Sequence, residues 1–469
     1  MSAASVADDQ TFEVDLAVIG SGGAAMAAAI EARQRGASAV LVERGTLGGT
    51  CVNRGCVPSK TLLAAAGARH AALANPFRGV PTSADEVDLA AVVEQKDELV
   101  GWLRQAKYAD VAAAWGFEIL SGTARFRDGE VLEVDGRPLR ARGYVVATGA
   151  QPHVGGIAGL EQVGYLTSTT AMELRDLPAS LVIIGGGYVG MEQAQLFAHL
   201  GSRVTVVGRL APHTEPELAD VMRRVFAEDG ITVVEEHAVA ATAAGDGGRV
   251  AVTTASGIHV EGQRVLVATG RRPDTTALNL PAAGVETDGR GFVVVDEHQR
   301  TSNPRAFAAG DVAGTPQYVY VAAASGRVAA ANALDPDAKR SVDYTGLPAV
   351  TFTRPQVASA GLSEQEALAA GHSCDCRVLE LADVPRALVN HDTRGAVKLV
   401  ADADTGRVLG VHAAADGAGE VMLAATYAIK AGMTVDDVAD TWAPYLTMAE
   451  SLRLVAGLFR NEMPTSCCA

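Results

Sequence analysis

Cysteine and positive charge are both scarce in this sequence, and it has no long apolar run. Six cysteines in 469 residues are too few for the disulfide framework of a small secreted protein. Lys and Arg number 39 against 55 Asp and Glu, and the formal net charge of -16 disfavours nucleic acid and anionic membranes as partners. Because no apolar run reaches the roughly 18 residues that a membrane helix needs, we expect neither a membrane span nor stable membrane association.

An export signal and long low-complexity segments are absent as well. The first apolar stretch, residues 16–30, follows four acidic residues, whereas a signal peptide begins with positive charge. We therefore expect a globular protein in the reducing cytoplasm. The cysteines that are present form three close pairs, which favours catalytic or metal chemistry there: Cys51 with Cys56, Cys374 with Cys376, and Cys467 with Cys468.

A dinucleotide-binding fingerprint lies near the N-terminus. Residues 14–19 are mostly apolar, which is typical of a buried parallel strand. Gly20, Gly22 and Ala25 follow as G-x-G-x-x-A, a pattern that permits a tight turn and brings a pyrophosphate to the N-terminus of a helix. Glu43 ends the next strand, 21 residues beyond Gly22, where an acid bonds a ribose hydroxyl. The segment therefore predicts a nucleotide site.

A second fingerprint begins 165 residues after the first. The position equivalent to Glu43 is here Gly208, followed by Arg209. With no carboxylate to repel a 2′-phosphate, and with Arg203 and Arg209 nearby, NADP is favoured over NAD. The alternative is that these arginines are ordinary solvated surface residues. The glycines of this second fingerprint are Gly185, Gly187 and Gly190.

The fold class that these patterns predict is α/β, with two Rossmann-like nucleotide-binding domains and a C-terminal α+β domain. Strands that end in Ala-Thr-Gly occur twice, at Gly149 and at Gly270. From about residue 341 the sequence alternates predicted strands and helices without a glycine fingerprint. We expect three domains: residues 1–149 with 276–340, residues 150–275, and residues 341–469.

The spacing of Cys51 and Cys56 has a geometric consequence. Five residues of regular helix separate Cα atoms by roughly 7.5 Å along the axis, beyond the roughly 6.8 Å that a disulfide tolerates. If these cysteines bond, the segment must be distorted, which Gly55 and Pro58 would permit. The alternative is two buried thiols that do not pair. A thiolate at the start of a helix would be stabilised by the unpaired backbone N–H groups there.

Residues 48–60, the two fingerprints and Gly310-Asp311 together resemble the flavin-dependent disulfide reductases, the pyridine nucleotide-disulfide oxidoreductases, over nearly the whole chain. The resemblance implies FAD in the first site, a nicotinamide cofactor in the second, which the residues there favour as NADPH, and a homodimer formed through the C-terminal domain. It makes Cys51 the exchanging thiol and Cys56 the thiolate that faces the flavin. It also assigns further residues to the cofactors: Thr50, Thr148, Gly149, the ion pair of Lys60 with Glu192, and Asp311 on the ribityl chain.

The C-terminal region distinguishes members of this family. Members that act on disulfides carry a histidine where this chain has Tyr445, with a glutamate five residues later, as Glu450 is here. A phenol ordinarily has a pKa near 10, so Tyr445 is a poor proton relay. Tyr445, Tyr188 and the Ser-Cys-Cys-Ala ending resemble the mercuric reductases. This resemblance implies that Hg(II) arrives as thiol complexes and is passed by the partner subunit's Cys467 and Cys468 to Cys51 and Cys56 as metal ligands.

Other functions stay open on the sequence alone. The chain could be a disulfide or dihydrolipoyl oxidoreductase, or a flavoprotein that only sequesters soft metals. Cys374 and Cys376, with His372, could bind a metal or be incidental thiols of a loop. About a dozen residues precede the first expected strand, so the sequence resembles the catalytic core of mercuric reductases without their N-terminal metal-binding domain.

Overall fold

The computed structural model describes residues 12–245, 248–335 and 337–461. By compactness the chain divides into two units, and the division falls inside helices α3 (Cys56–Leu73) and α4 (Leu89–Arg104). The first unit comprises Met1–Ser59, Glu94–His153 and Gly270–Asp343, and the second comprises Lys60–Val93, Val154–Thr269 and Tyr344–Ala469.

The first unit is built on a seven-stranded sheet with the order β3-β2-β1-β6-β5-β4, in which β17 also pairs with β6. The strands β3, β2, β1, β6 and β17 run parallel, whereas β4, β5 and β6 form an antiparallel meander. The strands are β1 (Phe12–Ile19), β2 (Ala39–Glu43), β3 (Glu118–Ser121), β4 (Ala124–Phe126), β5 (Val131–Val134), β6 (Arg137–Val146) and β17 (Ala306–Ala308), with a separate pair of β7 (Gln151–Pro152) and β16 (Arg271–Arg272).

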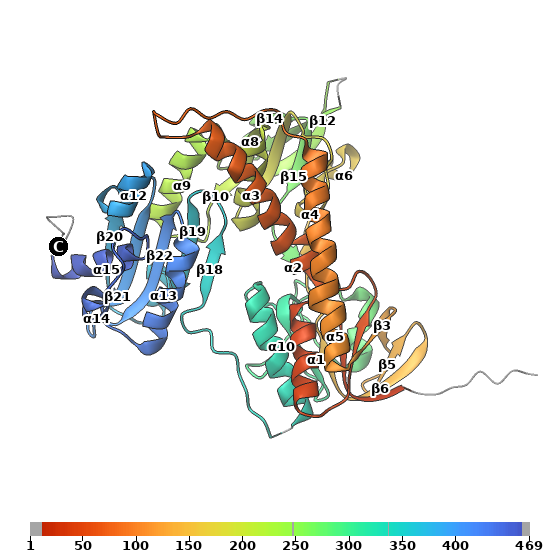
Figure 1. The fold of residues 1–469 in the computed structure, drawn as a ribbon. Coiled ribbons are helices and arrows are strands. Elements are labelled where there is room, and N and C mark those ends of the chain that lie inside the picture. Colours follow the sequence, from red (N-terminus) through yellow and green to blue (C-terminus); the bar gives the residue numbers. More distant parts are fainter. Residues whose placement is uncertain (1–11, 246–247, 336, 462–469) are drawn as a thin grey trace, which may run out of the picture. The chain divides into compact units, whose positions relative to one another are not determined.

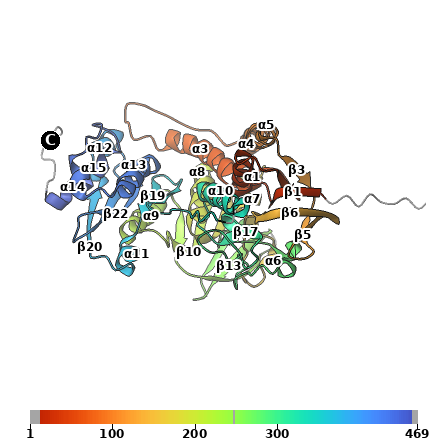
Figure 2. The same cartoon turned by 90° about the horizontal axis from the view of Figure 1, so that it is seen from below.

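Two helices of small residues pack together beside this sheet. α1 and α10 lie side by side in both views (Figures 1 and 2). A Cβ on Gly326 of α10 would lie 2.1 Å from the carbonyl oxygen of Ala24 in α1, so the two backbones touch. The helices of the unit are α1 (Gly23–Gln34), α2 (Gly49–Arg54), η1 (Gln105–Ala109), α5 (Asp110–Trp115), η2 (Thr276–Leu278), η3 (Leu280–Ala283), η4 (Gly310–Ala313) and α10 (Val319–Leu334).

The second unit contains a five-stranded parallel sheet with the order β11-β10-β9-β15-β8. Next in sequence to β11 is a three-stranded antiparallel sheet of β12, β13 and β14. The elements are β8 (Leu166–Thr167), β9 (Ser180–Gly186), β10 (Arg203–Leu210), β11 (Thr232–Val234), β12 (Ala238–Ala244), β13 (Arg249–Thr254), β14 (His259–Gly262) and β15 (Arg264–Val267), with helices α6 (Leu160–Val163), α7 (Ser168–Ala171), α8 (Tyr188–Leu200) and α9 (Pro216–Glu228).

The C-terminal part of the second unit is a five-stranded antiparallel sheet with the order β18-β19-β22-β21-β20. Its strand β21 is buried along its whole length, and α13 packs against β18, β19 and the central strand β22. The elements are β18 (Pro348–Thr351), β19 (Gln356–Gly361), α11 (Glu364–Ala369), β20 (Cys374–Glu380), η5 (Leu381–Asp383), α12 (Pro385–Asn390), β21 (Ala396–Asp402), β22 (Val408–Ala415), α13 (Ala418–Ala431), α14 (Val435–Asp440), α15 (Glu450–Gly457) and η6 (Leu458–Arg460).

The fold class expected from the sequence is confirmed. Both glycine fingerprints follow a parallel strand and open a helix, and the sequence beyond residue 344 forms an α+β sheet. The three domain boundaries stay a prediction. Within the described ranges, every helix is too short or too polar to cross a bilayer.

Candidate active site

The first fingerprint forms a tight turn between β1 and α1. Gly20 has a φ of +113°, and a Cβ there would lie 2.4 Å from the carbonyl oxygen of Ala147. Gly22 caps α1 without any side-chain hydrogen bond, so the first N–H groups of the helix are available to an anion. Ala25 is buried within α1. The turn can therefore receive a pyrophosphate against the helix N-terminus.

Glu43 ends β2 beside this turn and is held by hydrogen bonds to both carboxylate oxygens. The Ser21 hydroxyl donates to Oε2 at 2.6 Å, and the Gly45 N–H donates to Oε1 at 2.7 Å. Each carboxylate oxygen has further lone pairs, so Glu43 can still accept hydrogen bonds from a ribose. Glu43 could be predicted from the sequence because it is the last residue of a strand.

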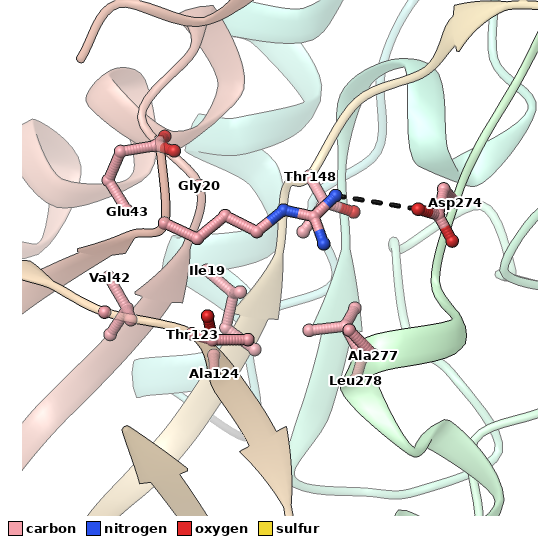
Figure 3. Close-up of a pocket in the computed structure, with 12 residues that line it drawn as sticks. Ile19, Gly20, Val42, Glu43, Thr123, Ala124, Thr148, Asp274, Ala277 and Leu278 are labelled. Carbon is pink, nitrogen blue, oxygen red and sulfur yellow. Dashed lines mark ion pairs between the residues drawn. The ribbon is translucent and has the colours of Figure 1, made fainter. Parts of the chain in front are cut away.

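Figure 3 shows the pocket that contains Glu43. The predicted residues Gly20, Glu43 and Thr148 line it together. An ion pair between Arg44 and Asp274, 3.7 Å long and marked by the dashed line, also lies here. Neither residue was predicted from the sequence, although Arg44 follows Glu43 directly; Asp274 comes from a distant segment. The other lining residues are Ile19, Val42, Gly122, Thr123, Ala124, Ala277 and Leu278.

The two cysteines of residues 51–56, the cysteine segment, lie on different helices. Cys51 is on α2 and is partly buried, whereas Cys56 begins α3 and is exposed. Gly55 interrupts the helical path between them, with φ -130° and ψ -110°. The interruption that a Cys51–Cys56 bond would require is therefore present. Cys56 stands at the N-terminus of an 18-residue helix, where the helix dipole stabilises a thiolate.

Two tyrosines of the first unit lie near enough to these cysteines for the cysteine charges to act on the phenols. Burial and the nearby charges of Cys51 and Cys56 raise the pKa of Tyr108 to about 12. Burial and Cys56 likewise raise the pKa of Tyr320 to about 12. Both phenols therefore stay protonated at neutral pH. Sequence reasoning missed these residues, because lone aromatics in η1 and α10 follow no pattern that points to the cysteines.

Asp311, at the start of η4, is held by an arginine. Arg271 donates to Asp311 Oδ2 at 2.5 Å and to the carbonyl oxygen of Ala150 at 2.5 Å. A longer contact of 3.5 Å reaches the hydroxyl of Thr50 on α2. Thr148 and Gly149 follow β6 in the same unit. Arg271 was not predicted, because its partners lie far from it in sequence.

In the second unit, Lys60 and Glu192 form the ion pair that the sequence predicts. The Lys60 ammonium lies 2.9 and 2.7 Å from the two carboxylate oxygens of Glu192. The N–H of Phe352 donates to Glu192 Oε1 at 2.9 Å, and the Lys60 ammonium lies 4.6 Å from the centre of the Phe352 ring. Glu192 is buried, so the pair fixes α3 against α8. Its position relative to a flavin stays a prediction.

The second fingerprint repeats the construction of the first. Gly185 has a φ of +110°, and a Cβ there would lie 2.4 Å from the carbonyl oxygen of Ala268. Gly187 caps α8 without a side-chain hydrogen bond. A Cβ on Gly190 would lie 1.9 Å from the carbonyl oxygen of Gly185, so helix and turn are in backbone contact. This is the geometry of a second pyrophosphate site.

The two arginines expected near the second nucleotide lie at opposite ends of β10. Arg209 is exposed near the carboxyl end, next to Gly208, whereas Arg203 is the first residue of the strand. Six residues of strand separate them, about 20 Å. Nucleotides bind at the carboxyl ends of parallel strands. Arg209 therefore lies at the end of β10 where a nucleotide would bind, and Arg203 lies at the other end.

Matches to two family models cover most of the chain. Residues 14–326 match the pyridine nucleotide-disulphide oxidoreductase family, and residues 347–456 match the dimerisation domain of these proteins. The chain belongs to the pyridine nucleotide-disulphide oxidoreductase family. Membership implies FAD in the first nucleotide site and NADH or NADPH in the second. The helices α1 and α8, which have no side-chain cap, and the glycine-rich turns before them fit such dinucleotides.

Mercuric reductases are among the similar members of this family. The chain is 54% identical to the mercuric reductase of Streptomyces lividans, over 97% of this chain and 98% of that protein. It is 43% identical to that of Shigella flexneri, over 97% and 82% respectively. Among solved structures, the HOCl-induced flavoprotein disulfide reductase RclA from Escherichia coli superposes with a TM-score of 0.84 at 28% identity, over 95% of this chain and 99% of that one.

The two tyrosines that resemble those of mercuric reductases are accessible. Tyr188 is the first residue of α8 and is 37% exposed, and Tyr445 lies between α14 and α15 and is 49% exposed. Glu450 begins α15, is buried and accepts a hydrogen bond from the N–H of Leu446 at 3.3 Å. Cys467 and Cys468 lie outside the described residues. Their roles, like those of the tyrosines, stay predictions.

Cys374 and Cys376 lie on β20 rather than in a loop. Burial and nearby carboxylates raise the pKa of both thiols, that of Cys376 to about 12. His372 is 2.8 Å from a carboxylate oxygen of Asp402. Thiols with a raised pKa are poor nucleophiles, so we assign this pair no catalytic role.

Proposed function

We propose that this protein catalyses the NADPH-dependent reduction of Hg(II) to elemental mercury, as a cytoplasmic homodimer. The observation that carries the proposal is the likeness to mercuric reductases over 97% of the chain. The Cys51-to-Cys56 segment and Tyr445, in place of the histidine that disulfide substrates require, support it. A dithiol beside a flavin would reduce disulfides equally well. Tyr445 and the two terminal cysteines are therefore the features that favour Hg(II) over a disulfide as the substrate.

The reaction needs two electrons, since Hg(II) and NADPH give Hg(0), NADP⁺ and a proton. FAD and NADPH, when bound, supply these electrons. The chain's own contribution is to bind and orient. Cys51 and Cys56 hold the soft ion as a two-thiolate complex. The N-terminus of α3 stabilises the thiolate of Cys56, and Tyr108 and Tyr320 lie near this segment as neutral phenols.

Delivery of Hg(II) is the finer part of the proposal. Cys467 and Cys468 of the partner subunit would take Hg(II) from small thiols and pass it to Cys51 and Cys56. Tyr188 and the partner subunit's Tyr445 would line the path, and their exposure is consistent with an entrance. Tethered thiols raise the local concentration of ligand without a new contact in the site itself.

Removing both tail thiols tests this delivery role. In Cys467→Ala with Cys468→Ala, we expect turnover of Hg(II) bound to bulky thiols to fall about tenfold or more, with a smaller fall for Hg(II) on small ligands. The measurement is the steady-state rate of NADPH oxidation with each ligand. Cys374→Ala with Cys376→Ala is the matched control that also removes two thiols. Wild-type rates with both ligands in the tail variant would contradict delivery.

The preference for NADPH rests on Arg209. A charged hydrogen bond is worth about 1.5–3 kcal/mol, so Arg209→Glu should raise the KM for NADPH about 10- to 100-fold and leave that for NADH nearly unchanged. Arg249→Glu makes the same charge change elsewhere in the second unit and should alter neither KM. If Arg209→Glu raises both KM values equally, a general disturbance of the site explains the effect.

One substrate comparison separates the candidate functions. The proposed enzyme oxidises NADPH continuously when Hg(II) is supplied with excess thiol, and is slow with oxidised glutathione or lipoamide. A disulfide reductase shows the reverse preference. A sequestering flavoprotein binds Hg(II) stoichiometrically and stops. Either of the last two results would overturn the proposal.

A further inference from the structure

Two histidines and an aspartate meet in the second unit, away from both fingerprints. His70 is on α3, His199 is on α8, and Asp229 caps the C-terminus of α9. Their possible ligand atoms all lie within 4.8 Å of one another, and among the described residues this is the group that could hold a metal. His70 and His199 are 129 positions apart in sequence, and His199 and Asp229 are 30 positions apart, yet the fold brings all three together.

The cluster is largely removed from water. His199 is 6% exposed, and the side chain of Asp229 is 3% exposed. His199 Nε2 lies 3.1 Å from Asp229 Oδ2, and the imidazole rings of His70 and His199 stack with centres 3.8 Å apart. Two rings at this distance cannot both be charged without strong repulsion. Neutral imidazole is the form that binds metals.

Both carboxylates and arginines lie near the cluster, and the charges of Arg354 and Arg394 act on His70 together with that of Asp229. Gln195 donates to Asp229 Oδ2 at 2.8 Å, and its hydrogen bonds to the backbone of Arg354 fix its amide. The Arg394 guanidinium lies 3.9 Å from Asp229 Oδ1, but it is bound by both carboxylate oxygens of Asp392 at 2.8 Å. Its charge is therefore largely neutralised by Asp392. Asp229 remains the carboxylate that can compensate a cation here.

We propose that His70, His199 and Asp229 bind one divalent ion of the Zn(II) class through two imidazole nitrogens and one carboxylate oxygen. This donor set suits zinc and its neighbours. It does not suit Hg(II), which prefers thiolates, or Mg(II) and Ca(II), which prefer oxygen. The ion takes the place of the hydrogen bond between His199 and Asp229. His70, which is partly exposed, turns its ring out of the stack to present a nitrogen.

A bound ion would strengthen the junction of α3 and α8 near His199, where the Arg69 guanidinium already donates to the His199 carbonyl oxygen at 2.8 Å. A separate connection is the Lys60–Glu192 ion pair. His70 lies ten residues beyond Lys60, and His199 lies seven beyond Glu192, about 15 and 10 Å along their helices. The Lys60–Glu192 ion pair and the bound ion would therefore join the same two helices at two different positions along their length. The ion is a brace for the helix that begins with Cys56, and it takes no part in electron transfer.

The test uses the holoenzyme, freed of metal with a chelator and then dialysed against Zn(II). His70→Ala should bind one zinc per chain fewer than the wild type, as should Asp229→Asn. Because cysteines also bind zinc, His372→Ala is the matched control: it removes a histidine that pairs with one carboxylate but with no second imidazole, and it should bind as much zinc as the wild type. X-ray absorption at the zinc edge should show imidazole scattering in the wild type that His70→Ala loses.

Thermal unfolding gives a second measurement that does not depend on activity. Zn(II) should raise the Tm of the wild type and of His372→Ala, but not that of His70→Ala. Equal zinc binding by His70→Ala and the wild type would overturn the proposal. Zinc bound only through sulfur in the wild type would overturn it too. Both results are independent of mercury reduction, so the fate of this site and of the proposed function can be told apart.

Discussion

In Cys56→Ser, the rate of Hg(II)-dependent NADPH oxidation should fall about a thousandfold or more, as expected when a group that bonds directly to the reacting atom is removed. Hg(II) is soft and requires two sulfur ligands in this account, and a serine oxygen cannot replace a thiolate. The exposure of Cys56 at the start of α3 allows incoming ion to reach it. The rate of Cys51→Ser should fall by a similar factor, because one remaining thiol cannot complete the two-thiolate complex.

Flavin content and bleaching of the flavin by NADPH should survive in both variants, since the glycine turns that bind the two nucleotides are intact. Cys376→Ser is the matched control: it makes the same atomic change on β20, outside the cysteine segment of residues 51–56, and should keep the wild-type rate. Activity above a tenth of the wild type in Cys56→Ser would show that Cys56 does not bind the ion that is reduced.

The second large effect is expected for Gly190→Ala. The added Cβ would lie 1.9 Å from the carbonyl oxygen of Gly185, so α8 must move away from the turn that receives the pyrophosphate. Overpacking of this kind costs about 1–3 kcal/mol, and we expect kcat/KM for NADPH to fall about 10- to 100-fold. Flavin content should not change, because the flavin fingerprint belongs to the first unit.

Gly67→Ala is the control for this change. Gly67 lies inside α3, and nothing lies within 4 Å of a Cβ built there. The substitution should leave the KM for NADPH unchanged and stabilise the protein by about 0.4–1 kcal/mol, because it restricts the unfolded chain. A wild-type KM in Gly190→Ala would contradict the close approach of α8 to its turn.

The parts of the site that could be predicted are those fixed by local backbone geometry. Gly20 and Gly185 occupy turns in which a Cβ would overlap a carbonyl group of the neighbouring strand, and only glycine suits such turns. Glu43 was found because it ends a strand of a βαβ unit. Lys60 and Glu192 were paired through a family resemblance, and the structure confirms their contact.

The parts that could not be predicted depend on contacts between distant segments. Arg271 reaches Asp311 across 40 residues of sequence, and His70 meets His199 across 129. No periodicity relates such residues, so only the folded chain brings them together. Arg203 and Arg209 are close in sequence, which indicated a shared role, but a strand carries residues six apart to opposite ends. The role of Arg203 stays a prediction.

Whether this protein reduces Hg(II) is tested by comparing the amount of NADPH oxidised with the amount of mercury released. The reduced holoenzyme is supplied anaerobically with NADPH, excess thiol and Hg(II), and the volatile mercury is trapped. We expect one mole of mercury vapour for each mole of NADPH oxidised, over many turnovers. NADPH oxidation without mercury vapour, or retention of Hg(II) on the protein at a few equivalents per chain, would contradict the account.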